Sequence, residues 1–331
     1  MLWRVARAAT DSVKVGWYPY RRVVTTTSPA AKNSAPLGAV GLVVIGLLCQ
    51  EVGASIAVLL FPTVGPIGMV TLRLAFSAII LLAISRPRLR GHSRSDWATV
   101  AVFGLVLAGM NALFYLALER IPLGPTVTIE VLGPLVLSVV VSRRASAWLW
   151  AALAFAGVVL LSQGGFESLD PIGVAFAVGA AITWAGYILM SERTGRRFPG
   201  FGGLALAMSI GAIVTIPFGA FTAGAALIRP EILLLGAAVA LASSAIPYGL
   251  ELIALRRLAA GTFSILMSVS PAIATAAGFL ILGQQLSVLQ GIAIVLVIVA
   301  SAGAVRSTRA NARRAERDGL DPTLDTGTPL A

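Results

Sequence analysis

The chain has 331 residues, of which 57% are apolar and only 12% are charged, and its mean hydropathy is +0.90. A soluble domain carries roughly 25% charged residues, so this composition excludes an ordinary soluble protein and predicts that most of the chain lies in lipid. The formal charge of +11 is compatible with a nucleic-acid partner. The basic residues, however, are spread over short segments between apolar stretches and form no phosphate-binding face, so we expect no nucleic-acid partner.

Apolar stretches recur along the whole chain. A membrane-spanning helix needs about 20 predominantly apolar residues, and ten stretches of this kind occur. They cover residues 37–60, 64–85, 97–118, 124–142, 146–162, 171–191, 201–222, 231–253, 261–283 and 286–305. Strand-like alternation is absent from them, and helices satisfy their own backbone hydrogen bonds in lipid. The pattern predicts an all-α integral membrane protein with ten transmembrane helices.

The distribution of Lys and Arg predicts the orientation. All but three of the 25 fall at the two ends of the chain or in the turns that follow even-numbered spans, and cytoplasmic segments are enriched in these residues. We therefore expect both termini in the cytoplasm. Residues 1–36 would form a cytoplasmic tail that rests on membrane lipid. Residues 306–331, basic and then rich in Gly, Pro and Asp, would form a disordered cytoplasmic tail.

A set of residues around the turn after the third span recurs around the turn after the eighth. Ala117, Leu118, Arg120, Gly124 and Pro134 are matched, at one constant offset, by Ala254, Leu255, Arg257, Gly261 and Pro271. Each half of the chain then holds five spans, and an odd number makes the second copy enter the membrane from the opposite face. The sequence thus predicts two inverted five-helix repeats, 37–166 and 167–305, an arrangement found in many secondary transporters.

Short motifs over nearly all of 37–305 resemble those of a known family. They are Gly53-Ala54-Ser55, Leu72-Arg73-Leu74-Ala75, Gly109-Met110-Asn111, Gly133-Pro134, Trp184-Ala185, Pro247-Tyr248 and Leu266-Met267-Ser268. On these residues the chain resembles the drug/metabolite transporter superfamily and, within it, the EamA family, in a branch of bacterial threonine/homoserine exporters. The resemblance implies a multi-pass protein of the bacterial plasma membrane that exports small amino acids of the threonine and homoserine type, coupled to protons.

Two positions depart from the pattern of that branch. The family carries a Glu immediately before the proline of the ninth span, where this chain has Ser270, and a Gly where this chain has Glu51. A role of the ninth-span carboxylate in proton coupling or substrate binding therefore does not carry over to this chain.

Glu130, in the fourth predicted span, is the main candidate for a functional charge, because an ionisable side chain is costly in lipid unless it faces protein or water. Thr126 and Pro134 lie one turn before and after it on the same face, and the proline removes a backbone donor. A carboxylate there can hold an ammonium group or a proton; the alternative is a structural ion pair with Arg73. The matching position of the second repeat is Met267, so we expect one acidic site.

Arg73 and Glu251 also lie inside predicted spans and are interpreted, like Glu130, as coupling or structural charges, while Glu51 lies inside the first span at a position where the family pattern has Gly. Arg73 can pair with Glu51, with Glu130 or with a substrate carboxylate, and a structural pair is the simpler interpretation. Glu251 is only a few residues from Arg256, which favours a structural pair near the membrane surface over contact with substrate.

Polar side chains at helical spacing complete the predicted site. Asn111 and Tyr115 are four residues apart, so they share a helix face and offer donors and acceptors for a small zwitterion. The alternatives are hydrogen bonds between helices and, for Trp184, plain packing. The full set of candidate substrate-binding residues is Asn111, Tyr115, Glu130, Trp184, Tyr187, Tyr248 and Ser268.

Other functions leave signatures that the sequence lacks. An intramembrane hydrolase needs a metal-binding motif, a Ser–His pair or facing Asp residues. The one histidine, His92, lies in a loop where we expect it to be solvated, and no Asp lies in a span. No phosphate-binding GxxxxGK[ST] loop occurs. We therefore predict no enzyme, no cofactor and no bound metal. An exporter of other metabolites, drugs or lipids is the alternative function, and a homodimer stays open.

Overall fold

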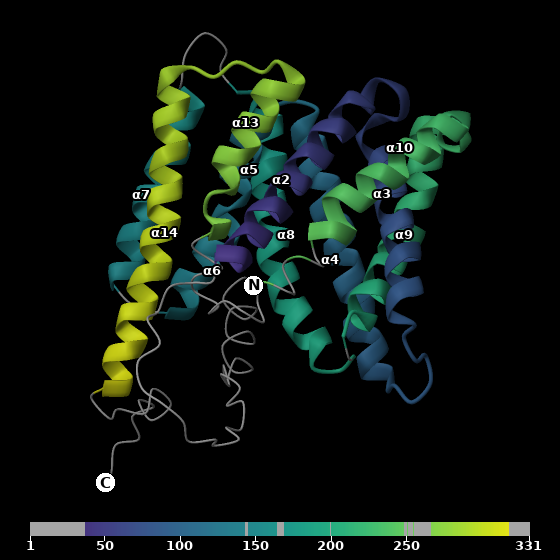
Figure 1. The fold of residues 1–331 in the computed structure, drawn as a ribbon, viewed down its shortest axis with the longest axis horizontal. Helices are drawn as coiled ribbons and strands as arrows, with labels where there is room; N and C mark the ends of the chain where they lie inside the picture. The colour runs from purple at the N-terminus through teal and green to yellow at the C-terminus, as the bar shows by residue number, and fades with distance from the viewer. Residues whose placement is uncertain are drawn as a thin grey trace. The chain divides into compact units, whose positions relative to one another are not determined.

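The computed structural model describes residues 37–142, 145–163, 169–198, 200–247 and 266–317, together with Leu250 and Ala254. Every regular element in these ranges is a helix (Figure 1). The first half contains α2 (Leu37–Leu59), α3 (Phe61–Ser85), α4 (Arg94–Leu118), α5 (Leu123–Glu130), α6 (Leu132–Ser142) and α7 (Ala145–Gln163). The second half contains α8 (Pro171–Gly195), α9 (Gly202–Ala223), η1 (Gly224–Ile228), α10 (Pro230–Ala240), η2 (Leu241–Ala245), α13 (Ser270–Leu282) and α14 (Val288–Arg317).

The all-helical membrane character predicted from the sequence is confirmed. Among the described residues, five helices are long and apolar enough to cross a membrane: Gly38–Leu59, Phe61–Ser85, Arg94–Leu118, Pro171–Gly195 and Gly202–Ile228. The other predicted spans coincide with shorter apolar helical segments: Leu123–Leu137, Trp148–Leu160, Pro230–Ala245, Ser270–Leu282 and Val288–Gly303. The count of ten crossings, the inverted repeat, its boundaries and the cytoplasmic termini stay predictions, and residues 1–36 lie outside the described residues.

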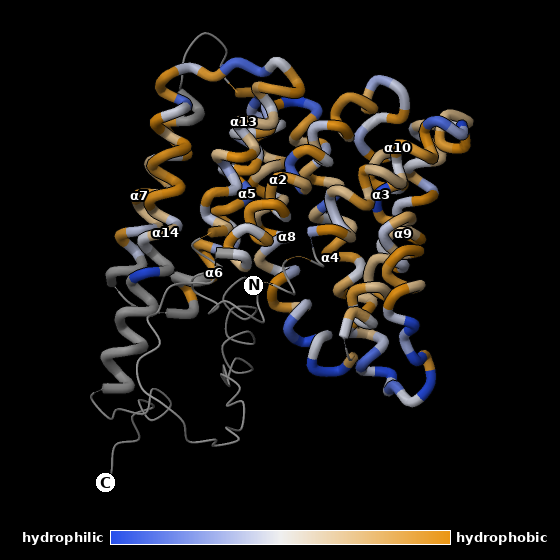
Figure 2. Tube along the Cα trace, viewed as in Figure 1, coloured by the Kyte–Doolittle hydropathy of each residue, from blue (hydrophilic) through white to orange (hydrophobic). Residues whose placement is uncertain are grey.

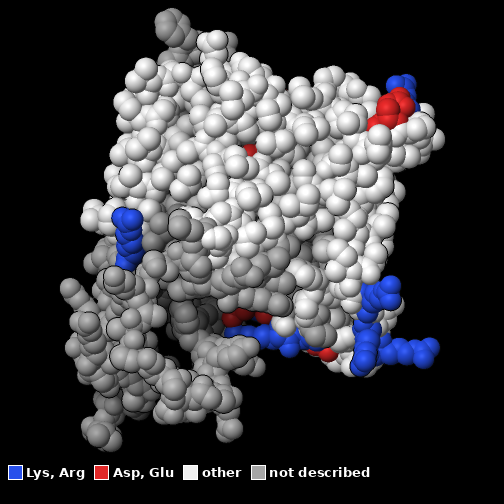
Figure 3. Space-filling view, in the orientation of Figure 1, with Lys and Arg blue, Asp and Glu red and all other residues white. Residues whose placement is uncertain are grey.

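Hydropathy follows the helices closely. Hydrophobic residues run along the helices, and hydrophilic residues gather in the turns that join them (Figure 2). On the face shown in Figure 3, charged side chains lie mainly near the helix ends, and most of the surface between them is uncharged. Many large apolar side chains are exposed on this molecule, among them Phe221 at 92% and Leu280 at 77%. Such a surface is expected of helices that face lipid.

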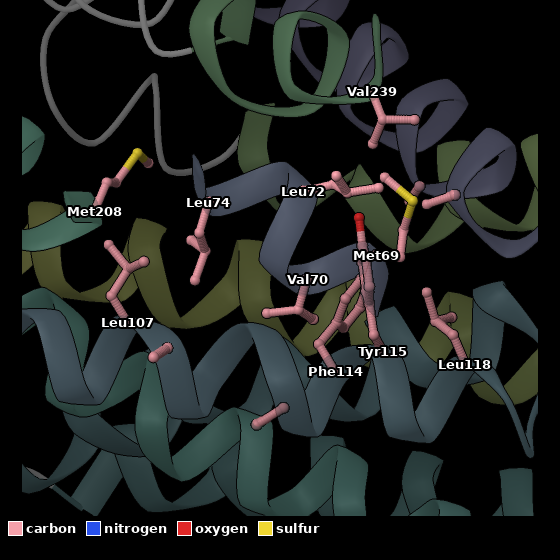
Figure 4. Packing of buried hydrophobic residues seen from close by; sticks show 14 of the residues in the cluster. Met69, Val70, Leu72, Leu74, Leu107, Phe114, Tyr115, Leu118, Met208 and Val239 are labelled. Carbon is pink, nitrogen blue, oxygen red and sulfur yellow. The ribbon is translucent and has the colours of Figure 1, made fainter. Parts of the chain in front are cut away.

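The helices of the first half pack mainly against helices of the second. The most extensive contacts are those of α3 with α9, α4 with α8, α7 with α14 and α4 with α9, followed by α5 with α13 and α2 with α13, and α2 also contacts η2. Figure 1 shows α7 and α14 side by side. The contacts between α3 and α9 and between α4 and α8 centre on the largest core cluster, which includes Leu74, Leu107 and Met208 (Figure 4). The site described below lies among these contacts between halves.

Three helices are interrupted where the sequence places proline or glycine. In α3, Gly65 has a positive φ of 67° just before Pro66, because a residue preceding proline is driven out of the helical region. The predicted fourth span is divided into α5 and α6 at Val131, directly after Glu130 and three residues before Pro134. After α10 the chain forms a short π-helical segment, η2, just before Pro247. These interruptions free backbone groups that a regular helix would pair.

The turns at the helix ends are tied by polar contacts between the halves. Arg120, after α4, forms an ion pair of 2.9 Å with Asp170, the N-cap of α8. Near the start of α4, Asp96 accepts a hydrogen bond of 3.1 Å from Arg197. The prediction that His92 is simply solvated is wrong: its ring is half-buried and stacks on Phe198 at a centroid distance of 4.2 Å. A flat aromatic ring in a turn gains more from stacking than from full hydration.

Helix α14 extends beyond the predicted tenth span. It continues from 305 to Arg317, because residues 306–317 hold Ala and Arg, which favour helix, and contain neither Gly nor Pro. The predicted disordered tail therefore begins as helix, and residues 318–331 lie outside the described residues.

Candidate functional site

Arg73 occupies the midpoint of α3 and joins the two halves of the chain. Its guanidinium donates hydrogen bonds to the hydroxyl of Tyr115 on α4 at 3.3 Å, to the hydroxyl of Ser244 at 3.4 Å and to the backbone carbonyl of Ser243 at 3.1 Å. It also lies 5.6 Å from the centre of the Tyr115 ring, within the range of a cation–π interaction. Arg73 therefore contacts α4 of the first half and η2 of the second half.

The carbonyl of Ser243 is available to Arg73 for a reason visible in the sequence. In a regular α-helix this oxygen would accept from the N–H four residues later, but that residue is Pro247, which has none. The surrounding π-helical turn, η2, is another departure from regular pairing. The hydroxyl of Ser243 is used within its own helix, where it donates to the carbonyl of Val239. The second half thus presents backbone as well as side chain to the arginine.

Tyr115 and Asn111 share a buried face of α4, as the sequence predicted from their spacing. Tyr115 is fully buried between the rings of Phe61 and Phe114. Figure 4 shows its ring beside Phe114, with the hydroxyl oxygen at the tip that points toward the side chains of α3. Asn111 is buried too, but its amide nitrogen donates to the carbonyl of Leu107, one turn earlier on the same helix, at 2.8 Å. The structure thus joins Tyr115, but not the Asn111 amide, to Arg73.

Glu51, on α2, is a second buried charge beside this cluster. Only 1% of its surface is exposed, and its carboxylate accepts a hydrogen bond of 2.9 Å from the hydroxyl of Ser270, the first residue of α13. It also interacts electrostatically with Arg73. Glu51 and Ser270, the two positions that depart from the family pattern, are therefore hydrogen-bond partners.

Glu130 lies at the last residue of α5, where the fourth predicted span is interrupted, and is half-buried. It interacts electrostatically with both Glu51 and Arg73, so the two carboxylates and the guanidinium belong to one cluster. Its backbone carbonyl lacks the regular helical donor, since the residue four positions later is Pro134. The sequence led us to expect one acidic residue at this site, and the structure adds Glu51.

The remaining predicted binding residues lie on α8, just before α13 or outside the described residues. Trp184 and Tyr187 on α8 are partly buried against the main core, and the Tyr187 ring lies 5.4 Å from that of Phe103. Ser268 is buried just before α13. Tyr248 and Glu251 lie outside the described residues. No group of three His, Cys, Asp or Glu side chains suited to a metal ion occurs within the part of the chain that the structure describes.

Sequence reasoning missed Ser243 and Ser270 and gave Glu51 little importance. Pro247 was a usable signal for Ser243, because a proline in a span identifies the carbonyl four residues earlier as free. The Glu51–Ser270 contact joins residues far apart in the chain, and spacing along one helix carries no information about it.

Comparison with known proteins gives a consistent set of relatives. The EamA-like transporter family matches residues 171–306. The threonine/homoserine exporter RhtA of Salmonella typhimurium (strain LT2) is 40% identical over 270 residues, which cover 81% of this chain and 91% of that protein. The protein of the same name from Escherichia coli (strain K12) is 38% identical over 279 residues, covering 84% and 94%.

More distant similarity extends to one uncharacterised transporter and to a solved structure. The uncharacterised transporter YvbV of Bacillus subtilis is 27% identical over 175 residues, 47% of this chain and 54% of that protein. A crystal structure with 18% sequence identity superposes with a TM-score of 0.57, covering 83% of this chain and 99% of the solved one. At that identity the likeness shows a shared fold alone.

Proposed function

The chain belongs to the EamA-like transporter family, and we propose that it exports small amino acids of the threonine and homoserine type in exchange for protons. It is a multi-pass protein of the bacterial plasma membrane, and relatives named as exporters support its assignment as a membrane exporter of a small molecule. The amino-acid substrate and the proton coupling are the parts that we propose.

The observation that carries the proposal is the arginine shared by the two halves. The hydrogen bonds of Arg73 to Tyr115 and to η2 measure 3.1–3.4 Å, longer than the 2.7–2.9 Å or so of a guanidinium–carboxylate bond. A substrate carboxylate that replaces them gains a shorter, charge-assisted and bidentate contact. We assign Arg73 to the carboxylate that all α-amino acids share.

The other end of a zwitterion needs an anion at a short distance from the arginine. Glu130 interacts electrostatically with Arg73, is half-buried and accepts no hydrogen bond from the described residues. A carboxylate in this position can accept one or two N–H groups of a substrate ammonium. Tyr115, Ser268 and, from the sequence, Tyr248 are proposed to contact the polar side chain. Asn111, Trp184 and Tyr187 are proposed to line the substrate site.

The test is uptake of labelled threonine and homoserine into inverted membrane vesicles, in which the cytoplasmic face is outside. With an acidic lumen, protons leave as substrate enters, so uptake by the wild type should exceed its own level without a gradient. Glu130→Gln removes the negative charge at constant size and should lose gradient-driven uptake of both amino acids. Glu231→Gln, at an exposed glutamate in the first turn of α10, is the matched control and should transport normally.

Three outcomes would contradict parts of this proposal. Folded wild-type protein that takes up neither amino acid would exclude the proposed substrates and leave only the family. Normal uptake by Glu130→Gln would keep the exporter and remove Glu130 from the site. Uptake of both amino acids that does not respond to the gradient would exclude proton coupling.

A further inference from the structure

Two buried hydroxyl groups beside Arg73 accept hydrogen bonds from it but donate none among the described residues. The guanidinium donates to the hydroxyl of Tyr115 at 3.3 Å and to that of Ser244 at 3.4 Å. Because each oxygen faces an N–H group, its own O–H proton must point away from the guanidinium. Neither hydroxyl donates to an acceptor within the described part of the chain. Tyr115 and Ser244 are 0% and 1% exposed, and a buried donor without an acceptor is costly.

Other buried hydroxyls near the site find an acceptor in their own helix. Those of Ser55 and Thr128 donate to the backbone carbonyl four residues earlier, which is a common arrangement for serine and threonine in helices. The hydroxyl of Ser243, directly before Ser244, does the same. Ser244 therefore departs from the use of buried hydroxyls around it, and its donor is available to a ligand.

The carboxylates of the cluster do not supply the missing acceptor. The side chain of Glu51 accepts its described hydrogen bond from Ser270, and Glu130 accepts none from the described residues. The two unmatched groups beside Arg73 are thus both donors, and they lie next to a positive charge. A ligand that satisfies them must offer acceptors and carry a negative charge.

A carboxylate matches these donors in number as well as in charge. Its two oxygens offer about four lone-pair sites, and a bidentate guanidinium fills two of them. The other two remain for the hydroxyls of Tyr115 and Ser244. A carboxamide of the same shape presents N–H donors where the site already has donors, and an ester carries no charge. The arrangement therefore fits a free carboxylate and disfavours both derivatives.

We propose that Tyr115 and Ser244 complete, together with Arg73, a carboxylate-binding site shared by the two halves, which restricts export to substrates with a free carboxylate. The proposal rests on the proposed function, because it specifies which part of the amino acid is recognised and by which residues. Ser244 is the new binding residue. The oxygen of Tyr115 keeps a lone pair for the polar side chain of the substrate. Binding moves no proton, since the substrate carboxylate balances the guanidinium.

The site can be tested by measuring which derivatives of threonine bind to the purified protein. Labelled threonine is bound in detergent solution and displaced by unlabelled threonine, by threoninamide or by threonine methyl ester. Both derivatives keep the ammonium group at about pH 6 and the side-chain hydroxyl, and differ only at the carboxylate. Wild type should bind threonine at least about 100-fold more tightly than either derivative.

Single variants then assign the preference to the two hydroxyls. Ser244→Ala and Tyr115→Phe should each weaken threonine binding by about tenfold or more, because each removes a hydrogen bond to a charged group. The affinity for threoninamide should change by less than about twofold, whereas a structural fault would weaken both ligands alike. Ser55→Ala is the matched control, since this serine is equally buried and its hydroxyl donates to a backbone carbonyl. It should leave both affinities unchanged.

The possible failures are distinguishable. If wild type binds neither threonine nor homoserine, the proposed function fails and the carboxylate site fails with it. If wild type binds threonine and threoninamide equally well, the carboxylate site fails while the exporter stands. The same conclusion follows if folded Ser244→Ala and Tyr115→Phe bind threonine as wild type does, or lose both ligands equally. If one variant does not fold, the other decides, because each hydroxyl is expected to have its own effect.

Discussion

The two halves of the chain bring different chemistry to one site. Among the described residues, the first half contributes the charges, on Glu51, Arg73 and Glu130. The second contributes neutral groups, namely the hydroxyls of Ser244 and Ser270 and the backbone carbonyl of Ser243. Both halves interrupt a helix near the site, the first after Glu130 and the second at η2. The described parts of both halves thus contain an interrupted helix near the site, but only the first half contributes charged side chains to it.

This difference suits a carrier whose halves move against each other. Inverted-repeat carriers work by the movement of one repeat or bundle relative to the other. If the charged groups reside on one half, they can keep their mutual distances during such a movement. The bonds that must break then join a charged group to a neutral one, and the bond of Arg73 to Ser244, at 3.4 Å, is long for a hydrogen bond. The arrangement therefore predicts a graded set of effects.

The largest effect on transport is expected at Arg73, the one cation in the described cluster. Arg73→Gln leaves Glu51 and Glu130 without the cation with which they interact electrostatically, and a buried charge left without its partner costs about 3–5 kcal/mol. We expect transport of threonine to fall by about 100-fold or more, together with a lower Tm in detergent. Arg73→Lys keeps the charge but loses the planar fork, so its transport should be intermediate.

Arg88→Gln is the control for this prediction, because Arg88 is exposed in the turn after α3. Transport by this variant should equal that of the wild type. If Arg73→Gln transported at the wild-type rate, the charges would have no part in transport and the contrast between the halves would lose its functional meaning.

The next largest effect tests whether the backbones of the two halves are really in close contact. A Cβ at Gly133 of α6 would lie 2.7 Å from the carbonyl carbon of Ala181 on α8, and still closer to its oxygen. Because backbone cannot move aside as a side chain can, Gly133→Ala should lower stability by about 1–3 kcal/mol, as overpacking does. Thermal unfolding in detergent measures this effect.

Gly291→Ala on α14 is the matched substitution, since a Cβ there meets nothing within 4 Å. It should be neutral or stabilising by up to about 1 kcal/mol, through the higher helix propensity of alanine. Equal Tm values for Gly133→Ala and Gly291→Ala would show that the contact between α6 and α8 is looser than described.

A smaller effect on transport should distinguish the contribution of the Ser243 carbonyl from that of its hydroxyl. Pro247→Ala supplies an N–H for the carbonyl of Ser243, which then competes with Arg73 for the same oxygen. A hydrogen bond contributes about 1 kcal/mol, so we expect a reduction of about fivefold in transport. Ser243→Ala keeps the carbonyl and should transport within about twofold of the wild type. The reverse order would mean that transport depends on the Ser243 hydroxyl and not on its carbonyl.

The sequence predicts the class of this fold well, because lipid imposes a simple rule on composition. A run of apolar residues such as Gly38–Leu59 becomes a helix whatever surrounds it. The sequence also singled out Arg73 and Glu130, since ionisable side chains are rare within spans. The partners of these residues were harder to predict. Ser243 and Ser270 are ordinary serines in their own helices, and only the packing of α3 on η2 and of α2 on α13 gives them a charged neighbour.

The smallest effect is expected at the ion pair between the halves near the helix ends, where charges remain in water. The hydrogen bond from Arg120, together with the backbone N–H of Ile172, lowers the pKa of Asp170. A lowered pKa in the folded state stabilises the protein above the unfolded value of about 4, and this contribution is lost as the pH falls through the folded value.

Asp170→Asn should therefore lower the Tm slightly at pH 7, and the difference from wild type should vanish in high salt and well below pH 4. Asparagine retains the N-cap acceptor of α8 that Asp170 supplies through Ile172, so the variant removes the charge alone. Both Asp170 and Arg120 are partly exposed, with side-chain accessibilities of 32% and 39%, and exposed ion pairs contribute little. A large loss of transport in Asp170→Asn at normal Tm would mean that this pair controls access to the site, and that charge matters at the helix ends as well as in the buried cluster.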